Sequence, residues 1–141
     1  MTIDTNILAY KKSGIADVKT ILDLMNTKTD WTPTVAVDAG SLSSASLSHA
    51  YYRYVAKNFV HISLRYSATY SATWTSTTFT TPFTIANDGA ALACTVVRVN
   101  SYYGASAEVR TSDNKIVVRC ASLSLTAAAY GIRVNGIIQI S

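Results

Sequence analysis

The chain contains 141 residues, of which 49% are apolar and 14% charged, and its formal net charge is +4. This length gives room for one domain and a short appendage, and the apolar content excludes a disordered chain. Two prolines and six glycines exclude a collagen-like protein, whereas abundant Ser, Thr and Tyr favour a β-rich domain.

Residues 1–29 are expected to form an arm and one short helix. Apolar residues occur there with the a and d spacing of a coiled coil: Ile15, Val18, Leu22 and Met25. An isolated helix of this length is marginal in water, so it either packs on its own β domain or bundles with copies of itself. We favour the bundle, because the apolar stripe ends just before the composition changes at residues 29–31.

Residues 30–141 are expected to form one all-β domain, because the apolar periodicity changes to two from Trp31 on. The expected strands cover residues 34–38, 46–56, 59–66, 78–85, 91–100, 103–110, 115–121 and 131–140, and residues 123–125 continue or begin another. Short polar turns at 57–58 and 111–114 predict two hairpins. Pro82 indicates a sheet edge or strand end, and the apolar C-terminal strand is expected to be central. About eight or nine antiparallel strands indicate a sandwich or barrel.

The β region offers little catalytic chemistry. Of the four carboxylates that follow Asp30, three lie beside turns, which explains them without catalysis: Asp38, Asp88 and Asp113. Glu108 stands alone in a strand, and the two histidines, His49 and His61, lie in separate strands. Cys94 and Cys120 lack metal-ligand spacing; buried free thiols are favoured for them, and a disulfide between them is the alternative. The sequence therefore predicts no enzyme, no metal site and no cofactor.

The excess positive charge lies in the β region, because four acids and four lysines cancel within residues 1–30. Its arginines sit singly within apolar strands: Arg53, Arg65, Arg98, Arg110, Arg119 and Arg133. A nucleic-acid groove usually clusters basic residues, so no nucleic-acid partner is expected. An arginine between apolar neighbours points away from the core, toward solvent, another subunit or a ligand.

Five aromatic residues are candidates for a saccharide-binding surface. Tyr66, Tyr70 and Trp74 lie in or beside a Ser/Thr-rich segment at 67–78 that is expected to be a loop. Tyr102 and Tyr103 lie at a second turn. Sugar rings stack on exposed aromatic faces while hydroxyl groups and arginines supply hydrogen bonds. The alternative is that these rings pack in the sheet or at a subunit boundary.

The segments WTPTVAVDAG and SHAYYRYVAKNFVHISLRY, with Pro82-Phe83 and the last strands, resemble the distal domain of phage tail-fibre, baseplate and receptor-binding proteins. The similarity covers residues 31–141. One departure is Ala56-Lys57, where these proteins usually have Gly-Lys.

This resemblance implies a homotrimeric, non-enzymatic virion protein that is made in the host cytoplasm. It implies that the apolar stripe at residues 15–25 trimerises, that the N-terminal segment contacts other virion proteins, and that the head adheres to a host surface saccharide. A capsid fibre, a decoration trimer and a tail or baseplate assembly protein are the alternatives. No membrane insertion is expected, because no apolar run reaches about 18 residues.

Overall fold

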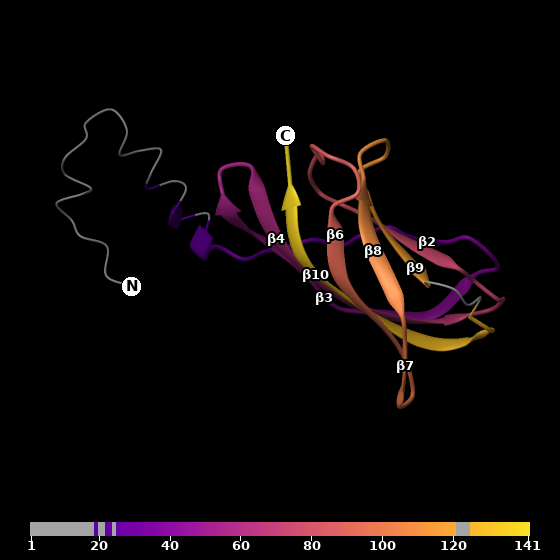
Figure 1. Cartoon of the computed structure of the whole chain (residues 1–141). Coiled ribbons are helices and arrows are strands. Elements are labelled where there is room, and N and C mark those ends of the chain that lie inside the picture. The colour runs from indigo at the N-terminus through magenta and orange to yellow at the C-terminus, as the bar shows by residue number, and fades with distance from the viewer. Residues whose placement is uncertain (1–18, 20–21, 24, 121–124) are drawn as a thin grey trace.

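The computed structural model describes residues 19, 22–23, 25–120 and 125–141. This part of the chain forms ten antiparallel strands that curl into a half-barrel (Figure 1). The strands are β1 (Thr29–Asp30), β2 (Val35–Val37), β3 (Leu42–Ala56), β4 (Phe59–Tyr70), β5 (Ser76–Thr80), β6 (Ala91–Arg98), β7 (Ser101–Tyr103), β8 (Ala105–Arg110), β9 (Lys115–Cys120) and β10 (Ala128–Gln139). The all-β class is confirmed, with more strands than the eight or nine expected.

The strand order is β1-β3-β4-β10-β6-β8-β9-β5-β2, and β7 pairs with β6. In the described part of the chain β1 pairs with β3 and β2 pairs with β5, so these two short strands end the sheet. The sheet is therefore curled but open at its ends, where a sandwich or barrel was expected.

Both expected hairpins are confirmed. Ala56 pairs with Phe59 across the turn between β3 and β4, and Arg110 pairs with Lys115 across the turn between β8 and β9. These turns are local in sequence, so their polar residues identify them without tertiary information. Strand β5 ends at Thr80, before Pro82, because proline cannot donate a ladder hydrogen bond.

The C-terminal strand β10 is central, as expected. It pairs with β4 along Ala128–Gln139 and with β6 along residues 131–135. Its inward residues are almost all apolar, and its pairing with β4 over its full length, with β6 alongside at residues 131–135, covers strand edges that would invite aggregation.

The half-barrel bends along β6. Residues 91–92 of β6 pair with β8, and residues 96–98 pair with β7, both in one continuous hairpin register. In this register residues 93–95 would face residues 104–106, but no ladder pairs form between them. Residues 93–95 pair only with β10, on the other side of β6. The strands separate at this point, so the sheet turns from the β3-β4-β10 half to the β8-β9-β5 half.

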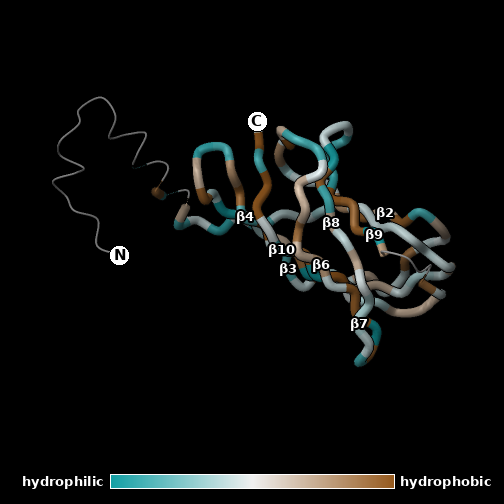
Figure 2. The backbone as a smooth tube through the Cα atoms, in the orientation of Figure 1, coloured by the Kyte–Doolittle hydropathy of each residue, from teal (hydrophilic) through white to brown (hydrophobic). Residues whose placement is uncertain are grey.

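The core fills the inside of the curl. In β4 the even-numbered residues 60–70 are buried, and in β10 the buried residues are also even-numbered, as the two-residue period of a strand requires. Figure 2 shows apolar segments along β9 and the end of β10. The largest fully buried side chains are Trp74, Tyr70 and Phe79.

The expected N-terminal helix falls mostly outside the described residues. Thr29 of β1 pairs with Tyr52 of β3, so the sheet begins one residue before the expected boundary at Asp30. No helix of the described residues is long and apolar enough to cross a membrane.

Candidate functional site

The sheet has one broad face turned away from the core, formed by β3, β4, β10 and β6. We call it the outer face. It carries the odd-numbered side chains of β4 and β10, which alternate with the buried ones. Paired residues lie side by side across it in rows. One row is Ser46, Ser67, Gly131, Val97 and Tyr102, and the next is His49, Arg65, Arg133 and Thr95.

Arg65 and Arg133 are direct cross-strand partners on this face, and both are exposed. The Cβ atoms of such partners lie about 4.5–5.5 Å apart, and like charges at this position repel one another. At a solvated surface the repulsion amounts to about 1 kcal/mol. Among the described residues neither guanidinium has a carboxylate within salt-bridge distance.

The arginines of β8 and β9, on the other half of the sheet, are neutralised. Arg110 pairs with Asp113 at 2.5 Å, and Arg119 pairs with Glu108 at 2.9 Å. The hydrogen bonds from Arg110, with Lys115 nearby, hold the pKa of the Asp113 carboxyl well below its usual range. Three arginines without a carboxylate partner among the described residues therefore share the outer face, Arg53, Arg65 and Arg133, whereas Arg98 lies over the ring of Tyr130 on the other side of the sheet.

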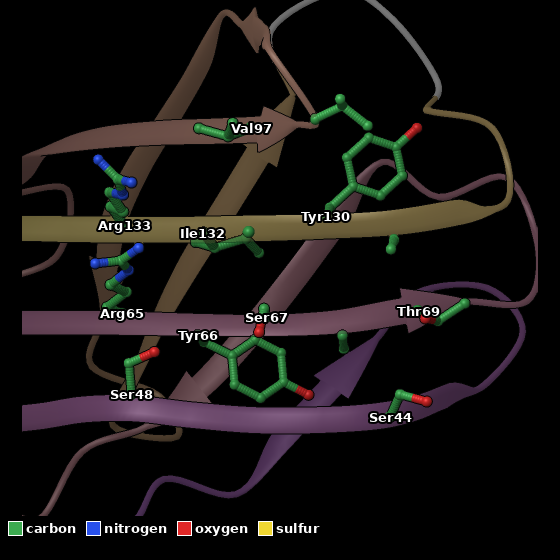
Figure 3. A pocket seen from close by; sticks show the side chains of 14 residues that line it. Ser44, Ser48, Arg65, Tyr66, Ser67, Thr69, Val97, Tyr130, Ile132 and Arg133 are labelled. Carbon is green, nitrogen blue, oxygen red and sulfur yellow. The ribbon is translucent and has the colours of Figure 1, made fainter.

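Two hollows adjoin the arginine pair. The larger, of about 520 Å³, extends along the sheet toward β7. Figure 3 shows Arg65 and Arg133 projecting side by side at one end of it, with Ser48 next to them and the hydroxyls of Ser67 and Thr69 further along. We call this hollow the outer groove. Gly131 lies in its floor, where the absence of a side chain leaves the space open.

The smaller hollow, of about 220 Å³, lies on the other side of the same two arginines. His49 Nε2 and Ser63 Oγ are 3.0 Å apart at its border, and His61 Nε2 lies 2.7 Å from Asn135 Oδ1 in the neighbouring rows. These contacts hold polar side chains in place on strands, which position a binding site more rigidly than loops.

The structure corrects the expectation that Tyr66, Tyr70 and Trp74 form an exposed ligand surface. Strand β4 extends to Tyr70 and β5 begins at Ser76, so much of the expected loop is sheet. Tyr66 is 4% exposed, Tyr70 1% and Trp74 0%. Trp74 stacks on Tyr70 with ring centroids 4.3 Å apart, and Tyr66 packs edge-to-face on Phe79. These rings stabilise the core.

Tyr102 and Tyr103 differ from one another. Tyr103 is half-buried, and its ring lies 5.9 Å from that of Tyr130 in the core. Tyr102 is 72% exposed and pairs with Val97, which lines the outer groove. Because cross-strand partners share a face, Tyr102 extends the groove row beyond Val97. It is the one predicted aromatic that the structure leaves open beside the groove.

Of the residues expected to trimerise, Ile15 and Val18 lie outside the described part of the chain. Leu22 is half-buried and Met25 is 36% exposed. The described residues contain no group of three His, Cys, Asp or Glu side chains placed to hold a metal ion. Cys94 and Cys120 are free thiols.

The sequence did not single out Arg65 and Arg133 as a pair. Both occupy outward-pointing positions of their strands, and the alternation of polar and apolar residues in FVHISLRY and GIRVNG indicates those positions. Their meeting depends on the register between β4 and β10, which are far apart in the chain.

No family model matches this chain, and neither a curated protein nor a solved structure is similar to it.

Proposed function

We propose that the protein is a non-enzymatic adhesion protein of a bacteriophage particle, in which the half-barrel is a fibre head that binds a host surface saccharide. The observation that carries this proposal is the outer groove. It combines hydroxyls from Ser48, Ser67 and Thr69 with guanidinium donors at one end, and the exposed Tyr102 ring lies at its side, across from Val97. Hydroxyl and guanidinium groups hydrogen-bond sugar hydroxyls, and a tyrosine face stacks on a sugar ring.

The viral setting rests on the resemblance of residues 31–141 to phage receptor-binding domains. In this proposal three chains associate through the stripe of Ile15, Val18, Leu22 and Met25, and the N-terminal segment attaches the head to other virion proteins. The outer grooves of three heads would then act together, because multivalency raises the avidity of weak saccharide sites.

The test is binding of the full-length chain to a glycan array. A Cβ atom at Gly131 would lie 3.9 Å from Tyr66 O and 4.0 Å from Val97 O, which is ordinary contact. Gly131→Val therefore adds bulk to the groove floor without a backbone clash. We expect Gly131→Val and Tyr102→Ala each to reduce glycan binding at least tenfold. Ala93→Val, which adds bulk to the outer face away from the groove, is the matched control.

Unchanged glycan binding in both groove variants, with all proteins folded, would remove the groove from this proposal. The viral setting has its own test. Antibodies against the β domain should label fibre tips on phage particles that carry the chain.

A second candidate is a capsid fibre, decoration or tail-assembly protein with no receptor role. The exposed apolar side chains Phe59 and Ile137, 40% and 53% exposed, favour it. They lie in adjacent rows of the outer face, beyond the smaller hollow, and would suit contact with another virion protein. Antibody labelling over the capsid or baseplate, together with an empty glycan array, would favour this candidate.

A further inference from the structure

If the outer groove binds a saccharide, as proposed above, the positive charge of the outer face favours an acidic one. Arg53, Arg65 and Arg133 are exposed on this face, and among the described residues none of them has a carboxylate partner within 4.0 Å. Asp30 shares the face, but it lies in β1 at the sheet edge, two strands from Arg65. Strands are spaced about 4.8 Å apart, so roughly 10 Å separate the two backbones.

The two central guanidiniums face the same space. Arg65 and Arg133 are paired across β4 and β10, and both line the larger and the smaller hollow. Figure 3 shows their side chains projecting from neighbouring strands in the same direction. A guanidinium presents a planar fork of donors that matches a carboxylate, sulfate or phosphate group. Two forks side by side are arranged to hold one such anionic group between them, which would also remove their mutual repulsion.

The surroundings of the pair favour a sugar over a nucleic acid. Small hydroxyl side chains line the groove: Ser48 lies beside the arginines, and Ser67 and Thr69 lie beyond them, over the open floor at Gly131. Single-stranded nucleic acids bind grooves with a succession of stacking rings and a track of positive charge. The outer groove instead has one charged end, a hydroxyl-lined middle and a single exposed ring, Tyr102.

We propose that Arg65 and Arg133 hold the anionic substituent of an acidic saccharide whose sugar rings lie along the outer groove. The acidic group is a carboxylate, sulfate or phosphate carried by the sugar. In this arrangement the arginine pair determines specificity, while the hydroxyls and Tyr102 contact the neutral part of the chain.

The test uses the full-length chain and two probes, a short sulfated dextran and neutral dextran of the same length, with affinity measured by calorimetry at two salt concentrations. We expect binding to the sulfated probe, weakened at higher salt, and little binding to the neutral probe. Arg65→Gln and Arg133→Gln should each lower affinity for the sulfated probe at least tenfold, the effect of losing a charge-assisted hydrogen bond.

Two control variants separate a built site from general positive charge. Arg119→Gln removes the same charge from the other half of the sheet, and its affinity should stay within about twofold of the wild type. Arg65→Lys keeps the charge but loses the planar fork, so its affinity should fall between the wild type and Arg65→Gln. Equal losses in Arg65→Gln, Arg133→Gln and Arg119→Gln would overturn the proposal, because they would indicate unspecific attraction.

The remaining outcomes distinguish this inference from the proposed function. Equal binding of neutral and sulfated dextran, sensitive to Gly131→Val but not to the arginine variants, overturns the acidic-group inference and leaves the saccharide site standing. Binding of a thymidine oligonucleotide as tightly as the sulfated probe overturns both in favour of a nucleic-acid site. Absence of binding to either dextran, with a glycan array that is also empty, overturns both as well.

Discussion

Trp74 is central to the packing of the half-barrel. Its ring is fully buried, stacks on Tyr70 and meets Tyr130 edge-to-face with centroids 5.5 Å apart. Truncating a core tryptophan removes its transfer free energy and leaves a cavity, at a cost of about 3–5 kcal/mol. We therefore expect Trp74→Ala to lower the melting temperature by roughly 10 °C or more, as measured by circular dichroism. Tyr102→Ala, at an exposed ring, is the control and should melt close to the wild type.

Two glycines with positive φ provide a second comparison. Gly40 (φ 74°) has no space for a side chain, because a Cβ atom would lie 2.7 Å from Ala72 Cβ and 3.0 Å from Ala72 N. Gly89 (φ 76°) has nothing within 4 Å of the same position. Both alanine variants bear the left-handed backbone cost of about 1–2 kcal/mol. We expect Gly40→Ala to be the less stable in urea unfolding, and equal stabilities would contradict the close approach of residues 40 and 72.

For single residues, the sequence predicts which interactions a side chain can make better than it predicts whether that side chain is buried or exposed. Tyr66, Tyr70 and Trp74 have the side chains of a sugar-binding surface and also those of a core. Their surroundings of Ser and Thr suggested a loop, yet in β4 the hydroxyls occupy the outward positions and the rings the inward ones. Arg65 and Arg133 become candidates for a binding site only because they are neighbours across β4 and β10.

The connection between β4 and β5 is tied to the end of β2 by Asp38. Both carboxylate oxygens accept the backbone N–H of Thr75 at 3.1 Å, and the Thr75 hydroxyl donates to one of them. Burial alone would raise the pKa of Asp38, but hydrogen bonds from Thr75 and Ser76 outweigh it and lower the pKa below its usual value. The folded state therefore favours the charged carboxylate.

This lowered pKa predicts a pH-dependent contribution to stability. The contribution is fully present above the unfolded-state pKa, near 4, and is lost as pH falls through the lower folded-state pKa. We expect Asp38→Asn to be less stable than the wild type by about 1 kcal/mol at pH 7, since the group is exposed, and the two proteins to converge near pH 2. Urea unfolding at both pH values measures this, and a difference independent of pH would contradict it.

The two thiols belong to strands β6 and β9 and are expected to be unreactive. Burial, with a smaller contribution from Cys120, raises the pKa of Cys94 to about 12. Burial, with a smaller contribution from Asp38, raises the pKa of Cys120 to about 11. Because the thiolate is the nucleophile, iodoacetamide at pH 8 should label the folded chain slowly and the urea-unfolded chain rapidly. Mass spectrometry measures this, and rapid stoichiometric labelling of the folded chain would show that the strands open.

Among the strands, the hairpins between sequence neighbours were predictable, and the pairing of strands far apart in the chain was not. The turns at Lys57-Asn58 and Thr111–Asn114 define their hairpins because both partners lie beside the turn. The pairing of β6 with β10 on one side and with β7 and β8 on the other has no local signal. The bend that makes a half-barrel depends on this pairing, so the sequence indicated many strands but not how they curl.

The whole molecule is expected to separate into an assembly segment and an independently folding head. Among the described residues, the apolar core and the side chains packed on it begin at Trp31. Removing residues 1–28 should therefore leave the β-rich circular dichroism spectrum and the melting transition in place. An unfolded truncated chain would show that the N-terminal segment belongs to the core.

The same truncation tests the trimer. Sedimentation should give three times the mass of one chain for the full-length protein and a smaller mass for the truncated one. A full-length protein that sediments as a stable monomer would contradict the role proposed for Ile15, Val18, Leu22 and Met25.

The central position of β10 has a consequence for the order in which the protein is made. Strand β4 is synthesised with its hairpin partner β3, but its other neighbour begins only at Ala128, after five further strands have been made. Until then the growing chain exposes an unpaired edge beside Ile62 and Leu64. Closing so distant a pair is slow, and an open apolar edge recruits other chains. Nascent chains halted before Ala128 should therefore aggregate or occupy chaperones, and refolding yield should fall as protein concentration rises.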